Sequence, residues 1–189
     1  MDMPMPVFIL LVALWVGSEV LIGRRRSADR GRAYDRGTLR LLYMAVYGAV
    51  GLALVLAWQR VGQFSPAFRM PLFWTGCVMM AAGMLLRAWS VRVLAEHFTV
   101  DVAIRPGHEL VRRGPYRLLR HPSYTGSLLT FYGFALALGS AWSLAVIVAA
   151  VTPAFLWRIQ VEEAVLRRAF PDAYPAYARA TKRLVPFVW

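Results

Sequence analysis

The stretch SLLTFYGFALALGSAWSLAVIVAAVTPAFLWRI, residues 127–159, holds no charged residue before Arg158. These 33 residues exceed the roughly 20 apolar residues that one membrane-spanning helix needs. Gly139 and Ser140 interrupt the run, and small, helix-weakening residues at this place indicate a turn. The stretch therefore predicts a helical hairpin in a membrane. Its first arm, residues 127–138, is short for a full crossing, so the arm is either tilted or part of a re-entrant pair.

Three more apolar segments precede this hairpin, over residues 6–22, 39–58 and 72–93, and each has about the length of a membrane span. The composition agrees, since 59% of the residues are hydrophobic and 17% are charged, whereas soluble domains have about 45–50% and 25%. We therefore predict an all-α, integral membrane bundle of about five transmembrane helices in a single domain, residues 1–189. Residues 1–93 form three spans, and residues 94–189 form a polar loop, the hairpin and an amphipathic tail.

Basic residues are distributed unevenly among the predicted loops. Of the 22 lysines and arginines, seven follow the first span, six follow the third and six lie from residue 158 onward, whereas two lie between the second and third spans. Basic residues concentrate in cytoplasmic loops. The N-terminus is therefore predicted outside, and the C-terminus and a cofactor site are predicted on the cytoplasmic side. The net charge is +12. Because the basic residues that cause it lie between apolar spans, contact with membrane lipids is favoured over contact with nucleic acid.

Cysteine and histidine are too sparse for a metal cluster. The chain has one cysteine, Cys77, and three histidines, which lie at positions 97, 108 and 121. Zinc sites need several such ligands at close spacing. No metal site and no disulfide framework are predicted.

Two segments are too rich in polar residues to be simple loops. The first, HELVRRGPYRLLRHPSYTG, covers residues 108–126 and leads directly into the hairpin. Its Gly-Pro and His-Pro pairs fix turns, because proline restricts both its own backbone and that of the preceding residue. The second, RIQVEE, covers residues 158–163. Arg158 and Glu162 are four residues apart, so on a helix they share one face near the membrane interface.

The same residues also have structural interpretations. Arg158 and Glu162 fit an ordinary helical ion pair worth about 0.2–0.5 kcal/mol, His121 fits a turn cap, and Tyr116 and Tyr124 fit the aromatic belt of a membrane protein.

Glu19 and Arg87 lie inside predicted spans, where ionisable groups are expensive. Glu19 is near enough to the end of its span to reach the interface. Arg87 either pairs with another group or faces a cavity.

Together, the two polar segments resemble the isoprenylcysteine carboxyl methyltransferase family. The resemblance covers residues 108–189 and rests on several motifs at specific spacings. These are His-x-Leu-Val at 108–111, Gly-Pro-Tyr at 114–116, Arg-His-Pro-Ser-Tyr-x-Gly at 120–126, Glu-Glu at 162–163, and a closing pattern of Phe170, Tyr174, Tyr177, Lys182, Arg183, Leu184, Pro186 and Phe187. Residues 1–107 resemble the family only as a set of membrane helices.

The resemblance implies S-adenosylmethionine as methyl donor and a lipophilic acceptor, most simply the carboxylate of a prenylcysteine-like compound that enters from the bilayer. Arg158 matches an arginine that the family uses to orient the acceptor. The eukaryotic members carry an amide side chain seven positions before His108, where this chain has Asp101, so that contact is not carried over. The implied cofactor-binding residues are His108, Glu109, Leu110, Val111, Tyr116, His121, Pro122, Ser123, Tyr124 and Glu162.

The chemistry of these side chains supports the same interpretation. S-adenosylmethionine carries a sulfonium and an ammonium group, so a site at the membrane edge needs a carboxylate and aromatic faces to offset their desolvation. Glu162, Tyr116 and Tyr124 provide both. A carboxylate acceptor is already ionised at pH 7 and needs no strong base. The planar guanidinium of Arg158 matches such a carboxylate.

Three other functions remain open at this stage. A phospholipid or other lipid amine N-methyltransferase has a similar histidine-proline and Glu-Glu pattern, and there a base such as Glu163 would matter more than Arg158. The fold also resembles the C-terminal part of the membrane sterol reductases, which use a nicotinamide cofactor. A non-catalytic membrane scaffold would need only the helices and their arginines, and the dense polar motifs argue against it.

Overall fold

The computed structural model describes residues 4–24, 37–95 and 110–186. Within these ranges the chain forms six α-helices and one short 3-10 helix. They are α1 (Met5–Gly23), α2 (Thr38–Trp58), α3 (Pro66–Leu94), η3 (Gly114–Arg117), α4 (Pro122–Ala137), α5 (Ala141–Ala169) and α6 (Ala173–Ala180). The all-α prediction is thereby confirmed for the described residues.

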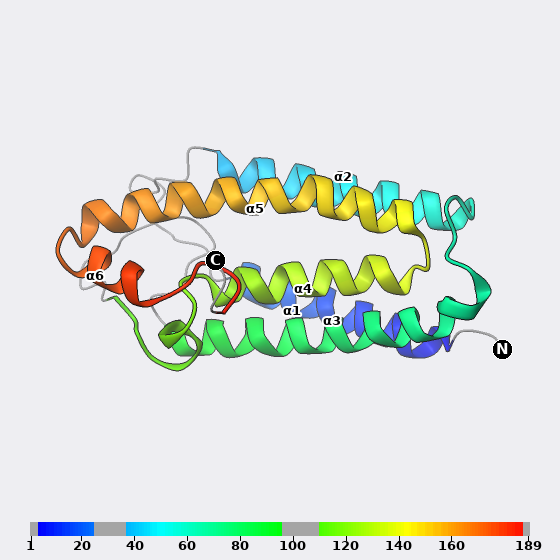
Figure 1. Cartoon of the computed structure of the whole chain (residues 1–189), viewed down its shortest axis with the longest axis horizontal. Coiled ribbons are helices and arrows are strands. Elements are labelled where there is room, and N and C mark those ends of the chain that lie inside the picture. Colours follow the sequence, from blue (N-terminus) through cyan, green and yellow to red (C-terminus); the bar gives the residue numbers. More distant parts are fainter. Residues whose placement is uncertain (1–3, 25–36, 96–109, 187–189) are drawn as a thin grey trace.

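The long helices lie nearly parallel or antiparallel to one another in a bundle (Figure 1). Figure 1 shows α4 between the pair formed by α2 and α5 and the pair formed by α1 and α3. In the described part of the chain, four helices are long and apolar enough to cross a membrane, namely α1, α2, α3 and α5. The fifth predicted span is the exception. With 16 residues, α4 is about 24 Å long, which is short of the roughly 30 Å hydrocarbon core.

The predicted hairpin is present, and its turn lies at the predicted place. Gly139 has a φ of +75°, which a residue without a Cβ adopts readily. The Ser140 hydroxyl then accepts a hydrogen bond from the Ser143 backbone N–H and so caps the start of α5. At the end of α4 that is remote from this turn, the helix begins earlier than predicted, at Pro122, because proline fits the first turn of a helix.

The helix pair α3 and α4 comes into very close contact through glycines. A Cβ atom placed on Gly76 would lie 2.5 Å from the Gly133 carbonyl oxygen, and one on Gly83 would lie 2.5 Å from that of Gly126. Each helix carries its two glycines seven residues apart, so both fall on one face. Such small residues let membrane helices approach closely without a hydrophobic driving force. This contact fixes α4 against α3 along most of the length of α4.

The predicted amphipathic tail is divided between the end of α5 and the separate helix α6. Val161, Val165 and Ala169 continue α5 to its end, because no helix-breaking residue separates them from the span. Pro171 follows that end, and the separate tail helix is α6. The described residues after α6 include Leu184, which is buried in the core.

Candidate active site

A cavity of about 890 Å³ opens within the bundle. One part is an apolar arm between α1, α2 and α4, lined by residues that include Phe8, Val12, Val50, Leu54 and Phe134. From Glu19 to Met5, both of which line the cavity, α1 rises by about 21 Å. The other part is a polar end near α6. Its lining residues are Glu19, Arg87, Tyr116, Arg120, His121, Ser123, Tyr124, Arg158, Glu162, Tyr174 and Tyr177.

The start of α4 forms one wall of the polar end. Gly114 has a φ of +57° and begins the short helix η3, after which Pro122 starts α4. His121, the residue before that proline, is the N-cap of α4 with a φ of −126° and a ψ of 53°, and its ring stacks on Tyr124 with centroids 5.6 Å apart. The Gly-Pro and His-Pro pairs thus place His121 and Tyr124 side by side.

A chain of hydrogen bonds crosses the polar end from α5 through α4 and back. Arg158 Nε donates to the Tyr124 hydroxyl at 3.0 Å, and that hydroxyl donates to Glu162 Oε2 at 2.7 Å. A further nitrogen of Arg158 donates to the Thr38 hydroxyl of α2 at 3.1 Å. Arg158 is 2% exposed, whereas the Glu162 side chain is 30% exposed. Tyr124 therefore lies between the two charged residues, which sequence spacing alone had placed on one helix face.

The two adjacent glutamates point in different directions, because successive residues on a helix are rotated by about 100°. Glu162 lines the cavity. Glu163 is 1% exposed, and its carboxylate accepts hydrogen bonds from Arg120 at 2.9 Å, Arg183 at 3.1 Å and Arg167 at 3.1 Å. The His121 ring lies between the pair, with Nδ1 3.9 Å from Glu162 and Nε2 3.5 Å from Glu163.

The chain after α6 pairs with the segment just before α4. The Lys182 N–H donates to the Leu118 carbonyl at 3.0 Å, and the Arg120 and His121 N–H groups donate to the Lys182 and Arg183 carbonyls at 2.7 and 3.1 Å. Arg120 also donates through its side chain to two carbonyls of α6 and the following turn. The tail thereby holds the His-Pro turn in place.

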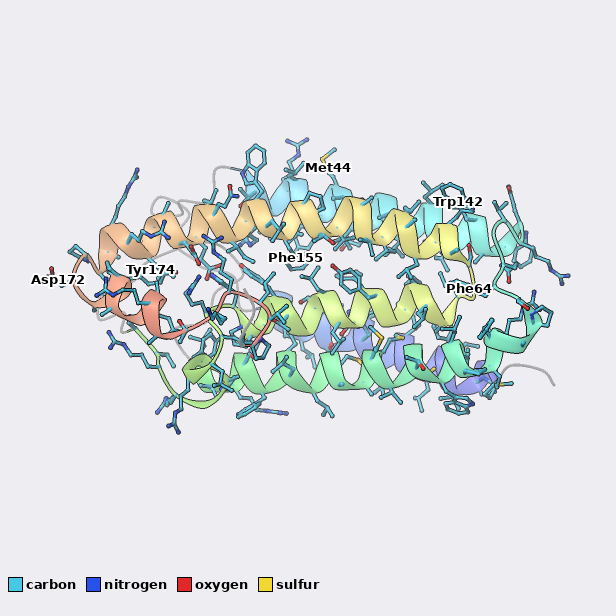
Figure 2. The ribbon with its side chains drawn as sticks, viewed as in Figure 1. Met44, Phe64, Trp142, Phe155, Asp172 and Tyr174 are labelled. Atoms are coloured by element: carbon cyan, nitrogen blue, oxygen red, sulfur yellow. The ribbon has the colours of Figure 1, made fainter. Side chains whose placement is uncertain are left out.

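Two tyrosines of α6 complete the polar end. The Tyr177 hydroxyl donates to the Tyr116 carbonyl at 2.8 Å, and burial raises the pKa of Tyr177 to about 12, so the phenol keeps its proton near neutral pH. Tyr174 is fully buried and lines the cavity, and Figure 2 shows it at the α6 end of the bundle. Its hydroxyl has no hydrogen-bond partner among the described residues. A buried hydroxyl in this state can bind a water or the polar group of a ligand.

The ionisable residues inside the spans also meet at this cavity. Arg87 of α3 donates two hydrogen bonds to Glu19 of α1, at 2.5 and 2.8 Å, and a third to the Ser123 hydroxyl at 2.9 Å. Both Glu19 and Arg87 line the cavity. The expectation that Arg87 either pairs or faces a cavity is confirmed in both respects.

Most of the residues that the sequence nominated come together here. Leu110, Val111, Tyr116, His121, Ser123, Tyr124, Arg158 and Glu162 all line the cavity. Pro122 is buried but does not line the cavity, because it forms the first turn of α4. His108 and Glu109 lie outside the described residues.

Sequence reasoning had not assigned a site role to Arg87, Arg120, Tyr174 or Tyr177. A signal existed for Arg87, since a charge within a span is a functional hint. The tyrosines had appeared only in the closing pattern of the tail. In the part of the chain that the structure describes, no three metal-ligating side chains come together.

Comparison with known proteins identifies similarity to one family of methyltransferases. The model of the phospholipid methyltransferase family matches residues 71–173, more than half of the chain. Protein-S-isoprenylcysteine O-methyltransferase B of Arabidopsis thaliana is 34% identical over 115 residues, which are 60% of this chain and 58% of that protein.

Two other relatives carry the same enzyme name. A probable protein-S-isoprenylcysteine O-methyltransferase of Oryza sativa subsp. japonica is 31% identical over 117 residues, 61% of each chain. The protein-S-isoprenylcysteine O-methyltransferase of Schizosaccharomyces pombe is 28% identical over 164 residues, 85% of this chain and 70% of that protein. The chain thus spans about three fifths of the length of the plant relatives that it matches.

Proposed function

We propose that the chain, which belongs to the phospholipid methyltransferase family, transfers a methyl group from S-adenosylmethionine to the carboxylate of a lipophilic, prenylcysteine-like acceptor. One observation carries this proposal. A single cavity joins an apolar arm to a polar end that contains both Arg158 and Glu162, so one space offers a cation for the acceptor and an anion for the cofactor.

The residues of the polar end fit S-adenosylmethionine. Glu162 supplies a carboxylate that is exposed to the cavity and offsets the positive charge of the cofactor. The rings of Tyr116 and Tyr124 supply aromatic faces, and the hydroxyl of Tyr174, which no described residue hydrogen-bonds, supplies a buried polar group. When bound, S-adenosylmethionine supplies an electrophilic methyl group on its sulfonium sulfur.

The acceptor side follows from Arg158 and the apolar arm. The arm is lined by aliphatic and aromatic side chains, and covering a hydrocarbon chain there releases about 25 cal/mol per Å² of apolar surface. Arg158 is held in a fixed orientation by Tyr124 and Thr38. Because the acceptor carboxylate is already ionised, these residues need only orient it and exclude water.

A lipid amine acceptor is less well supported. An amine would need a general base, and Glu163 was the candidate for that role. Its carboxylate is buried and accepts hydrogen bonds from three arginines, so it is poorly placed to receive a proton. The nicotinamide-dependent reductase and the non-catalytic scaffold find no support in the names of the relatives, which are O-methyltransferases.

We place the polar end of the cavity on the cytoplasmic side of the membrane and the N-terminus outside. The ends of α1 and α3, the start of α4 and the tail all lie at the α6 end of the bundle (Figure 1). The segments rich in arginine follow or precede these elements, and such segments face the cytoplasm. Cytoplasmic S-adenosylmethionine would then reach the site directly.

Glu162→Gln should weaken the binding of S-adenosylmethionine. The amide retains an oxygen that can accept from Tyr124 but loses the negative charge, and charged hydrogen bonds contribute about 1.5–3 kcal/mol, which is roughly 10–150-fold in affinity. Titration calorimetry on the detergent-solubilised protein measures this effect, with Asp172→Asn on an exposed turn as the matched control. Wild-type protein that binds a nicotinamide cofactor but not S-adenosylmethionine would refute the methyltransferase proposal.

A further inference from the structure

We infer that Glu19 and Arg87 are positioning residues for the acceptor. Their ion pair fixes the end of α1 nearest the polar end of the cavity, and with it the wall along which the acceptor's hydrocarbon chain lies. The inference rests on the proposed function for the nature of the acceptor. The geometry of the pair itself does not depend on that proposal.

The pair has a two-pronged geometry, and its arginine is the more buried partner, with 14% of its side chain exposed against 39% for Glu19. Two nitrogens of Arg87 donate to the two oxygens of Glu19, an arrangement that holds both groups in one plane. Both residues lie in helices apolar enough to cross a membrane, where ionisable side chains are costly and are retained mostly for function. A helix needs no such pair merely to pack.

After Trp15, the described part of α1 has little besides this ion pair to hold it. Among the described elements, α1 packs closely on α3 but not on α2. Both α1 and α2 nevertheless line the apolar arm. The aromatic contacts of α1 come from Phe8 and from Trp15, which packs on α4 one helical turn, about 6 Å, before Glu19. Beyond Glu19, Val20 and Leu21 are more than half exposed. The Glu19–Arg87 pair therefore sets the distance between α1 and α2 at the place where the apolar arm meets the polar end of the cavity.

Arg87 also contacts the residues proposed to bind the cofactor, but by a single hydrogen bond. Its third hydrogen bond goes to Ser123, a residue of the first turn of α4 beside His121 and Tyr124. The Ser123 backbone is held independently, since its carbonyl accepts from Ser127 and α4 is fixed to α3 at Gly126. Loss of the pair should therefore affect the acceptor more than the cofactor.

The kinetic test uses Glu19→Gln and Arg87→Gln in lipid nanodiscs, with an N-acetylated S-prenylcysteine as acceptor. We expect the acceptor KM to rise about tenfold, with a smaller change in kcat, while the dissociation constant of S-adenosylmethionine stays within about threefold of wild type. Arg92→Gln, which removes an exposed arginine from the same helix, should leave both constants unchanged. A cofactor constant that rises as much as the acceptor KM would overturn the inference, because the pair would then support the whole site.

A distance measurement tests the position of α1 without methyl transfer. Spin labels at Leu21 of α1 and Met44 of α2 lie on exposed positions that do not line the cavity, and Figure 2 shows Met44 pointing away from the bundle. The single native cysteine, Cys77, is replaced by alanine. Glu19→Gln should broaden or lengthen the distance distribution, and Arg92→Gln should not. An unchanged distribution in active protein overturns this inference alone, whereas a wild-type protein that methylates no prenylcysteine overturns the proposed function.

Discussion

Arg158→Ala should lower the turnover of a carboxylate acceptor by roughly 10²–10³-fold, the loss typical of one preorganised donor in a site closed to water. Arg158 is almost completely buried and is oriented by Tyr124 and Thr38, so no solvent cation can replace it. Cofactor affinity should remain near wild type, because Glu162 keeps its hydrogen bond from Tyr124. Single-turnover methyl transfer and calorimetry on the same preparation measure the two effects.

Arg158→Lys provides the matched variant. Lysine keeps the charge but lacks the two-pronged geometry of guanidinium, so turnover should fall while cofactor binding is retained. Under the amine alternative, removing a cation beside the acceptor would do little harm. A wild-type rate for Arg158→Ala with normal cofactor binding would end the carboxylate hypothesis.

Glu163→Ala should destabilise the protein by about 3–5 kcal/mol, the loss typical of removing one partner from a buried ion pair. Three guanidinium groups donate to this carboxylate. Arg120 is only 12% exposed in its side chain and would keep an uncompensated charge. Since Arg183 of the tail also donates to Glu163, the contact between the tail and the His-Pro turn should weaken. Thermal unfolding in detergent, followed by circular dichroism, measures the loss.

Glu162→Gln and Glu163→Gln form the matched pair for this prediction, because each replaces one of the two adjacent glutamates by its uncharged amide. We expect Glu162→Gln to leave the unfolding temperature nearly unchanged while it weakens cofactor binding. Glu163→Gln should show intermediate destabilisation, since the amide oxygen still accepts a hydrogen bond. Equal stability losses for Glu162→Gln and Glu163→Gln would contradict the division of roles between the two glutamates.

The spans were predictable from the sequence because membrane crossing imposes a length and an apolar composition that a single segment must satisfy. The observed helices α1, α2 and α3 contain the predicted segments 6–22, 39–58 and 72–93. The ends of helices were less predictable. Pro122 starts α4 five residues before the apolar run, because local proline chemistry rather than hydropathy decides that boundary.

The site was predictable to the extent that its residues are local in sequence. The two polar segments, residues 108–126 and 158–163, nominated eight residues that line one cavity. The contacts that the sequence did not supply join distant residues: Glu19 and Arg87 are 68 positions apart, and Arg120 and Glu163 are 43 apart. Such pairs depend on how whole helices pack, and no local spacing encodes that packing.

The hydrogen bond between Arg158 and Tyr124 illustrates the same limit. Spacing of four residues suggested a direct helical ion pair between Arg158 and Glu162. In the folded chain the Tyr124 hydroxyl, from a different helix, accepts from one and donates to the other. Placing that hydroxyl required the packing of α4 on α5 around Phe155, whose ring contacts Tyr124 and lies between the two helices in Figure 2.

The most direct test of the proposed function is the chemical nature of the methylated product. Purified protein is incubated with methyl-labelled S-adenosylmethionine and, in separate reactions, with an N-acetylated S-prenylcysteine or a phospholipid that carries a primary amine. The lipid product is then treated with mild alkali, which hydrolyses a methyl ester to volatile methanol but leaves an N-methyl group in place. We predict labelled methanol from the prenylcysteine reaction and none from the phospholipid reaction. Label that resists alkali and appears in the phospholipid would contradict the carboxylate assignment.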